Sequence, residues 1–315
     1  MILYVFRRLG YMLITLFIAS LIIFSVTQWL PGDVARVILG REPGEEAVAA
    51  LREELGLDEP LPAQYGLWLI NFVQGDWGTS YSTGTTILPL VMQRLENSLY
   101  LAGLTLLIAV PLSVTLGIVA GLAKDTWVDN VISISALSVV GLPEFVTGLV
   151  LIQIFAFGLG LLPSSSSVAP GATLGEMFPM LILPALTATL VLLAYVSRLV
   201  RSGVIEEAEK PYVRIATLKG LPYRQVVFRH ILRNALLPTI TVLAISFGWL
   251  ISGLVVVENV FNFPGLGRLL VFAIDRSDLP LIRAIIMLTV VAFTMANLVA
   301  DLLYGALNPR IRLGE

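Results

Sequence analysis

The sequence contains no cysteine and only one histidine among its 315 residues. Without cysteine the chain forms no disulfide, no iron–sulfur cluster and no cysteine-ligated zinc site. The single histidine, His230, supplies one imidazole, which excludes a metal site built from several histidines. We therefore expect this chain to bind no metal ion and no cofactor of its own.

Nucleotide-binding and hydrolytic motifs are absent as well. The sequence has no G-x-x-x-x-G-K-[ST] loop for phosphate, no H-E-x-x-H pair for zinc and no G-x-S-x-G turn for a nucleophilic serine. We expect no catalytic residue, no ATP hydrolysis by this chain and no enzyme activity. A membrane enzyme is the weakest of the alternatives, because one histidine offers no nucleophile–base pair.

Charge is scarce. Only 13% of the residues are charged and 57% are hydrophobic, whereas a soluble domain has about 25% charged and about 45–50% apolar residues. The formal net charge of −2 favours no particular soluble partner, and no nucleic acid is expected to bind. The composition indicates that the lipid bilayer surrounds most of the chain.

Long apolar runs are what the chain has instead. A membrane-spanning helix needs about 20 mostly apolar residues. Six stretches meet this requirement, and only the third contains a charge, Glu144: they are residues 9–30, 97–123, 130–163, 177–197, 234–257 and 284–300. The first is too long for a signal peptide and lacks a small-x-small cleavage site, so we expect a retained anchor. The predicted fold is all-α and polytopic, with about six transmembrane helices.

The distribution of basic residues predicts the orientation. With six spans and a cytoplasmic N-terminus, 13 of the 20 Lys and Arg residues lie inside, as the positive-inside rule requires. Both termini are then cytoplasmic. The predicted organisation is an N-terminal segment and first span (1–30), an extracytoplasmic segment (31–96) and a transmembrane core (97–315).

The extracytoplasmic segment is acidic and partly helical. It has about six more acidic than basic residues, and residues 45–55 mix apolar and charged side chains at helical spacing. Gly56 follows as a stop signal. We expect a small cap outside the membrane, too short to be a separate domain.

The longest inside segment, residues 198–237, contains the most informative pattern. Pro211 and Pro222 each stand where a helix can begin, and Gly220 where the first would end. This predicts helices at 211–219 and 222–236, joined by a Gly-Leu-Pro turn. Two readings remain open on physical grounds: a compact knob that docks on a partner, and a basic amphipathic loop that rests on anionic headgroups.

The residues of this segment resemble a known motif. Residues 212–221 read YVRIATLKGL and residues 230–238 read HILRNALLP. They resemble the EAA loop of ABC importer permeases, most closely that of the dipeptide/oligopeptide branch. Arg214 replaces the Glu of the generic motif, as is common in this branch, and Lys210-Pro211 replaces a frequent acidic pair. The replacement of the acidic pair by Lys210-Pro211 affects which salt bridges are expected with an ATPase. It does not affect the prediction that the segment docks.

Further motifs of this branch occur in order along nearly the whole chain. They are LPGD at 30–33, LGLDEPL at 55–61, GDWGTS at 75–80, VENVFNFPGLG at 257–267 and NPR at 308–310. The outer motifs resemble the B-type rather than the C-type subunit. The resemblance implies the type I ABC importer permease fold, in a prokaryotic inner membrane.

The resemblance also implies partners and site residues. The partners would be a homologous C-type permease, two ABC ATPase subunits that hold ATP and Mg, and an extracytoplasmic solute-binding protein. The implied ATPase-coupling residues are Tyr212, Val213, Arg214, Ala216, Lys219, Gly220 and Leu221. The implied motif after the fifth span comprises Glu258, Phe261, Pro264, Gly265 and Gly267. His230 occupies a family position and is expected to be structural.

Two hypotheses explain the charge of Glu144 inside a predicted span. A charge deep in a span costs about 2.5–3.5 kcal/mol even on insertion scales, so it usually faces a cavity or a partner. Glu144 would then line the translocation path and meet a cationic group of the solute. Alternatively, Pro143 and Glu144 open a half-helix whose dipole the carboxylate complements.

The expected function is therefore that of a permease subunit in an ATP-driven importer, with di- or oligopeptides as the first choice of solute. Glutathione, nickel chelates and oligosaccharides are alternatives within the same role. A self-sufficient secondary transporter is the alternative of another class, although such proteins usually show internal repeats and charged midplane sites.

Overall fold

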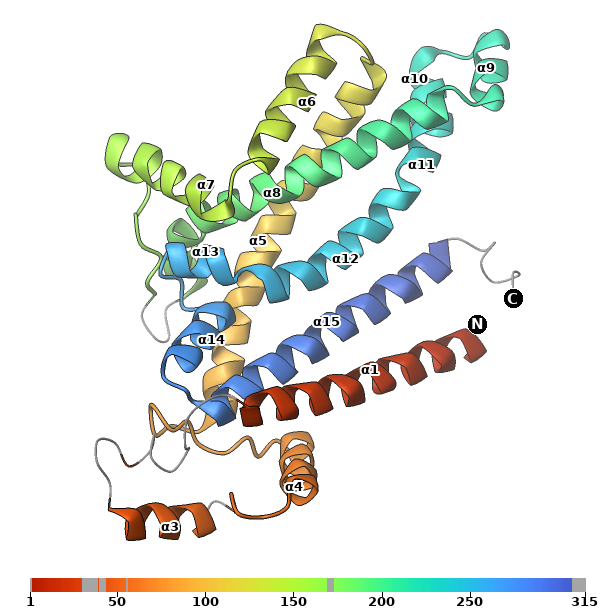
Figure 1. Cartoon of the computed structure of the whole chain (residues 1–315). Coiled ribbons are helices and arrows are strands. Elements are labelled where there is room, and N and C mark those ends of the chain that lie inside the picture. Colours follow the sequence, from red (N-terminus) through yellow and green to blue (C-terminus); the bar gives the residue numbers. More distant parts are fainter. Residues whose placement is uncertain (1, 30–38, 40–43, 55, 169–172, 308–315) are drawn as a thin grey trace. The chain divides into compact units, whose positions relative to one another are not determined.

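The computed structural model describes residues 2–29, 39, 44–54, 56–168 and 173–307. In these ranges the chain is helical with no β-strand, apart from an isolated antiparallel bridge between Thr79 and Thr86 (Figure 1). The all-α prediction is confirmed. The motifs at 30–33 and 308–310, and Leu55, lie outside the described residues.

The chain divides into two compact units. Unit 1 comprises Met1–Ser98 and Pro264–Met295, and unit 2 comprises Leu99–Phe263 and Ala296–Glu315. The long helices α5 (Ile87–Leu122) and α15 (Leu279–Leu307) each contribute to both. These helices have 36 and 29 residues and are predominantly apolar, and α5 continues through Pro111 in its interior.

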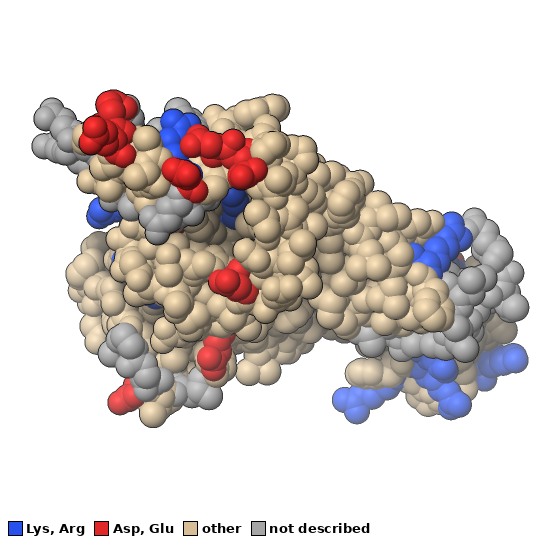
Figure 2. Space-filling model, turned by 90° about the horizontal axis from the view of Figure 1, so that it is seen from below, with Lys and Arg blue, Asp and Glu red and all other residues tan. Residues whose placement is uncertain are grey.

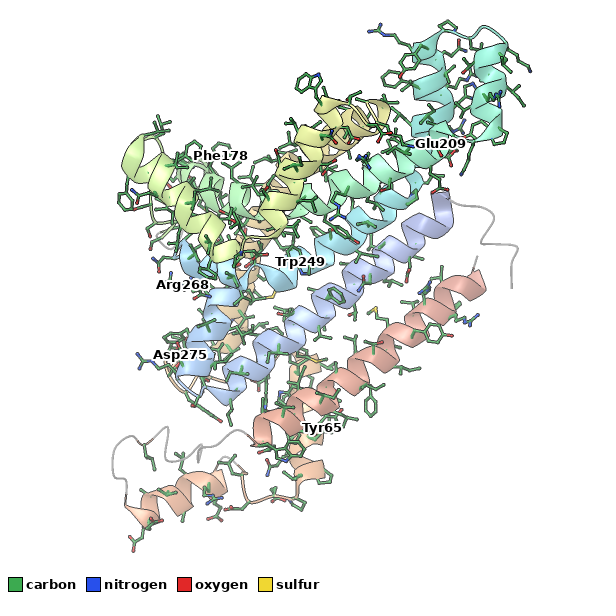
Figure 3. The ribbon with its side chains drawn as sticks, turned by 45° about the horizontal axis from the view of Figure 1, so that its top comes forward. Tyr65, Phe178, Glu209, Trp249, Arg268 and Asp275 are labelled. Carbon is green, nitrogen blue, oxygen red and sulfur yellow. The ribbon has the colours of Figure 1, made fainter. Side chains whose placement is uncertain are left out.

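Unit 1 begins with the long apolar helix α1 (Ile2–Trp29). Its other complete helices are α3 (Glu45–Glu54), α4 (Leu61–Gln74) and α14 (Leu266–Asp275). Helix α3 confirms the predicted outer helix, and acidic side chains gather on this part of the surface (Figure 2). Helix α4 was not predicted: it begins at a proline, ends at the left-handed Gly75, and its Tyr65 contacts α1 (Figure 3).

Unit 2 is arranged around α8 (Leu174–Ala208), against which several helices of the unit pack. The helices before it are α6 (Trp127–Val140), α7 (Glu144–Leu151) and the π-helix η1 (Ile152–Gly158). Those after it are α9 (Pro211–Leu218), α10 (Tyr223–Gln225), the π-helix η2 (Val226–Ile231), α11 (Leu232–Ala235), α12 (Leu237–Gly253) and α13 (Val255–Val260).

Two glycines allow α5 to approach α8 closely. A Cβ atom at Gly117 would come within 2.6 Å of the Ser197 carbonyl oxygen, and one at Gly121 within 2.7 Å of the Val204 Cβ. The two glycines are four residues apart, which is the small-xxx-small spacing of packed membrane helices. The close approach sets the distance between α5 and the central helix of the unit.

The membrane-spanning helices agree with the predicted number and differ in shape. Within the described residues, four single helices are long and apolar enough to cross a bilayer: Val5–Trp29, Ile87–Leu122, Gly175–Ala208 and Leu279–Leu302. Counting each of two bent pairs as one span brings the number to six; these pairs are Trp127–Val140 with Glu144–Gly158 and Tyr223–Ala235 with Leu237–Leu250. The chain is therefore polytopic, as predicted.

The third predicted span, residues 130–163, is not a single helix: it is broken before Glu144, as the half-helix hypothesis for Pro143 and Glu144 expected. The chain bends by 106° between α6 and α7, at Gly141, Leu142 and Pro143. Proline has no N–H group and clashes with the preceding turn, and the residue before it is pushed out of the helical conformation. Hydrophobicity alone did not reveal this break, because both halves are apolar.

The second inside helix, predicted at 222–236, is present as the continuous helical segment Tyr223–Ala235. It differs from the prediction in its middle, because α10, the π-helix η2 and α11 follow one another without a break. The π-helix is a wider turn in which N–H groups bond five residues back, and such turns are frequent at functional sites.

Candidate functional site

The candidate site is a compact group of short helices at residues 211–235, which we call the knob. Its first helix, α9, begins with Pro211 at its first position and ends at Leu218. Gly220 has φ 77° and donates its N–H to the Thr217 carbonyl over 2.9 Å. This left-handed residue ends the helix, so the predicted bounds of 211–219 agree with the structure to within one residue.

Helix α9 has two different faces. Val213 and Ala216 are buried against a cluster that includes Val226 and Ile231. On the other face Ile215 is 53% and Leu218 78% exposed. Arg214, Lys219 and Gly220 are exposed, while Leu221 packs against the cluster: the predicted coupling residues are thus shared between the two faces. Lys and Arg side chains gather around this part of unit 2 in Figure 2.

Tyr212 joins the two halves of the knob. Its hydroxyl donates a hydrogen bond to the Glu207 carboxylate and accepts one of 2.9 Å from Asn234 Nδ2. Burial raises the pKa of Tyr212, and the hydrogen bond to Glu207 raises it further, so the hydroxyl keeps its proton. The hydroxyl of this predicted coupling residue is therefore engaged within its own chain.

Lys210 explains the departure from the acidic pair. Its ammonium group donates to Glu207 and lies 3.6 Å from Glu206. The hydrogen bond to Glu207 raises the pKa of Lys210. The basic residue before α9 is thus paired with the last turn of α8.

His230 lies in η2 and contributes its backbone to this arrangement. Its carbonyl oxygen accepts a 3.3 Å hydrogen bond from Asn234 Nδ2. This contact involves the backbone only, so the structural role of the His230 imidazole stays a prediction.

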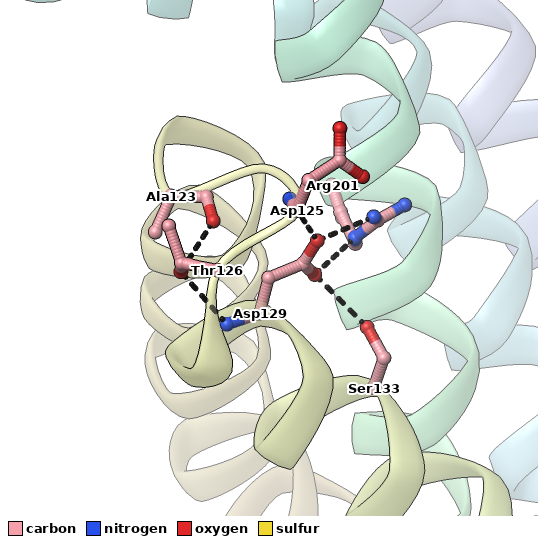
Figure 4. A network of polar contacts seen from close by, with 6 residues as sticks. All are labelled: Ala123, Asp125, Thr126, Asp129, Ser133 and Arg201. Carbon is pink, nitrogen blue, oxygen red and sulfur yellow. Dashed lines mark hydrogen bonds and ion pairs between the residues drawn. The ribbon is translucent and has the colours of Figure 1, made fainter.

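An ion pair with a buried carboxylate, close to the knob, was missed from the sequence (Figure 4). Asp129 of α6 has a 2% exposed side chain and binds Arg201 of α8 through two bonds, Nε to Oδ1 at 2.5 Å and Nη2 to Oδ2 at 2.6 Å. The Asp125 N–H and the Ser133 hydroxyl donate to the same carboxylate over 3.0 and 3.1 Å. We call this ion pair the clamp. Its partners are 72 residues apart, and no local spacing indicates such a pair.

A second ion pair lies beside the clamp. Lys124, in the turn between α5 and α6, binds Glu209 over 2.7 Å. Glu209 is the C-cap of α8 and immediately precedes Lys210 (Figure 3). The pair is exposed, so it is worth little by itself, but it places this turn against the base of the knob.

Glu144 is the first residue of α7. Pro143 precedes it in an extended conformation, and the carboxylate is half-buried at the N-terminus of the helix. A negative charge at this end is favoured by the helix dipole. The geometry is that of the half-helix hypothesis, and a role in the translocation path stays a prediction.

The motif after the fifth span forms a buried corner in unit 2 and a helix start in unit 1. Glu258 and Phe261 are buried, and the Phe261 ring packs against Gly148 of α7, where an added Cβ would lie 3.2 Å away. The Phe261 carbonyl accepts a 2.7 Å hydrogen bond from the Ser166 N–H.

The remaining motif residues, Pro264, Gly265 and Gly267, belong to unit 1. The Pro264 carbonyl accepts a 2.9 Å hydrogen bond from Asn97, Gly265 is the N-cap of α14, and Gly267 lies in its first turn. This part of the motif fixes the start of a helix.

These features define a class of protein: a multi-pass membrane protein in which a short, partly exposed helix projects from the end of a long apolar one. The family model described as binding-protein-dependent transport system inner membrane component matches residues 113–313, and the model of its N-terminal region matches residues 1–102. The chain belongs to this family of ABC importer permeases and is a permease subunit of the plasma membrane.

Curated relatives match over almost the full length. The glutathione transport system permease protein GsiC of Escherichia coli strain K12 is 37% identical over 309 residues, which is 98% of each chain. The protein of the same name from Salmonella choleraesuis has the same identity and coverage. A crystal structure of an amino acid ABC transporter with histidines covers 70% of this chain at 20% identity, with a TM-score of 0.49, and the family assignment does not depend on it.

Proposed function

We propose that this chain forms part of the solute path of an ATP-driven importer and that its knob docks on an ATPase subunit. The complex would contain a second, C-type permease, two ATPase subunits that bind ATP and Mg, and an extracytoplasmic solute-binding protein. Nucleotide-driven closure of the ATPases would move the knob, and the spans would alternate between outward-facing and inward-facing states.

The outward face of α9 carries this proposal. Ile215 and Leu218 expose apolar surface next to Arg214 and Lys219. The opposite face of the helix is packed inside the knob, so the outward side chains are available to a partner. An apolar centre with a basic rim is typical of a protein–protein contact. Family membership favours an ATPase over lipid headgroups as this partner.

We further propose a short peptide as the solute, with glutathione, itself a tripeptide, as the first compound to test. The proposal is supported by the GsiC proteins, which are named as glutathione permeases and match this chain end to end. No described side chain specifies a peptide bond, and in such systems the binding protein selects much of the solute. Metal chelates and oligosaccharides are therefore included in the test.

The test is ATP-dependent uptake into proteoliposomes that contain this chain with its partner subunits and binding protein. Labelled glutathione, dipeptides and hexapeptides are compared with a nickel chelate and an oligosaccharide. We expect uptake of a peptide that requires ATP. Uptake of only the chelate or the sugar would keep the permease role and reject the peptide.

The docking part of the proposal is tested on the same vesicles. Gly220→Asp combined with Arg214→Glu alters the end and the charge of α9, and should abolish uptake and capture of the ATPase. Arg276→Glu reverses an exposed charge in unit 1, at the C-cap of α14, and serves as the matched control. Normal ATPase capture by the double variant would contradict docking through α9.

A further inference from the structure

Helix α6 packs along α8, and the clamp is a two-bond ion pair between these two helices. Of its residues only Asp129 and Ala136 are buried, whereas Trp127, Ile134 and Val140 are 76%, 63% and 55% exposed. Apolar contacts allow packed helices to slide by small amounts. A two-bond arginine–carboxylate pair has a defined geometry and resists sliding. The position of α6 along α8 therefore depends on Asp129 and Arg201.

The carboxylate of Asp129 is fully used by this arrangement. Its two oxygens accept from Arg201, from the Ser133 hydroxyl and from the Asp125 N–H. The last contact also supports Asp125 in its left-handed conformation, with φ 63°. Figure 4 shows that the clamp thus orders the turn before α6 as well as the helix itself.

The clamp also lies close to the knob along α8. Arg201 is seven residues before the end of the helix at Ala208, which is about 10 Å at 1.5 Å per residue. Beyond it, Glu207 binds Lys210 and Tyr212 at the start of α9. The last turns of α8 therefore carry two polar contacts, from Arg201 to the first turn of α6 and from Glu207 to the start of α9, with helical backbone between them.

At its other end α6 leads into the break of the span. The chain bends at 141–143, and α7 begins at Glu144. A displacement of α9 that is transmitted to α6 would therefore reach the bend. We propose that Asp129 and Arg201 are positioning residues that make α6 follow the movement of the knob and α8. This inference rests on the proposed function of the knob and adds the route by which its movement reaches the broken span.

The experiment compares three variants in the complete complex. Asp129→Asn removes the charge that Arg201 needs. Asp129→Asn with Arg201→Gln removes both charges and leaves no unpaired buried ion, so it tests the clamp if the single variant does not assemble. Asp125→Asn makes the same chemical change in the same turn, at a residue that hydrogen-bonds to the clamp through its backbone N–H and whose side chain acts on Arg201 through its charge alone, and is the matched control.

The first readout is the distance between α6 and α8. Because the chain has no cysteine, Ser138→Cys and Ser202→Cys place spin labels on exposed positions of the two helices. With the clamp intact, the distance distribution should stay narrow and unchanged when nucleotide is added. In the clamp variants it should broaden or shift, while Asp125→Asn should match the wild type.

The second readout is solute transported per ATP hydrolysed. We expect about a tenfold loss in the clamp variants, which lies within the range that substitutions along a coupling route produce. Unchanged label distances and an unchanged ratio would overturn the inference. Failure of both clamp variants to assemble, with Asp125→Asn intact, would give the pair a folding role only and would also overturn it. If the wild-type complex shows no ATP-dependent uptake, the proposed function is contradicted, and this outcome is distinct from a failure of the clamp inference.

Discussion

Helix α9 and the corner around Phe261 both belong to motifs of the same family, yet the structure uses them in opposite ways. Phe261 is completely buried against Gly148. Helix α9 buries one face and exposes Ile215 and Leu218 on the other. A family motif can therefore mark a contact surface or a packing requirement, and the exposure of its apolar side chains distinguishes the two.

The largest expected effect is at the buried corner. Phe261→Ala should lower the free energy of unfolding by about 3–5 kcal/mol, because it removes a fully buried ring and leaves a cavity. Ile215→Ala on α9 should change it by less than about 0.5 kcal/mol, as exposed substitutions do. Thermal unfolding of the purified chain in detergent measures both. Equal losses would remove the distinction between the two motifs.

On helix α9, in contrast to the Phe261 corner, a substitution should affect binding of the ATPase subunit and leave folding unchanged. Leu218→Glu should weaken binding of the ATPase subunit by about 2 kcal/mol, the cost typical of a central interface residue. The variant should unfold at the same temperature as the wild type, since Leu218 is 78% exposed. Titration of the purified chain with the ATPase subunit gives the affinity. Tight binding by the variant would place the docking surface elsewhere.

Gly148 at the Phe261 corner and Gly220 at the end of α9 are expected to be limited by different factors. At Gly148 the limit is space, so Gly148→Leu should cost about 1–3 kcal/mol of stability through overpacking against Phe261. At Gly220 there is open space but φ is 77°. There Gly220→Asn should be tolerated better than Gly220→Ala, because asparagine adopts left-handed conformations more readily.

The two limits are distinguished by the order of unfolding temperatures among the variants at each glycine. Thermal unfolding should rank alanine above leucine at Gly148, and asparagine above alanine at Gly220. The same order of side-chain size at both positions would show that space alone limits them.

The smallest expected effect is at Tyr212. Tyr212→Phe removes one hydroxyl from its bonds with Glu207 and Asn234, and should lower stability by about 1 kcal/mol. If the hydroxyl acts within the knob, the isolated chain should show this loss without any ATPase present. A variant of unchanged stability that binds the ATPase less tightly would instead assign the hydroxyl to the docking surface.

Local sequence signals predicted the individual elements well. Pro211 and Gly220 set the limits of α9, and the mixed pattern at residues 45–55 predicted α3. Both rest on rules that act within one or two helical turns. Helix α4 lies between the motifs at 55–61 and 75–80, in a stretch for which no helix was predicted.

Other features depended on contacts that no local rule describes. Lys210 and Tyr212 bind the last turn of α8, so the knob is closed by its own chain. The wide turn of η2 was likewise not predicted, since six residues are too few to distinguish π-helical from α-helical spacing of apolar side chains.

By itself the sequence determined that this is an integral membrane protein, that the chain crosses the bilayer about six times and that it belongs to the ABC importer permeases. These conclusions follow from hydrophobicity, proline and glycine positions and short motifs, which are properties of neighbouring residues. Only the tertiary structure decided that Asp129 meets Arg201, and that one span is bent by 106°. The physical reason is that an ion pair between distant helices and the angle at a helix break are set by packing, which no run of adjacent residues specifies.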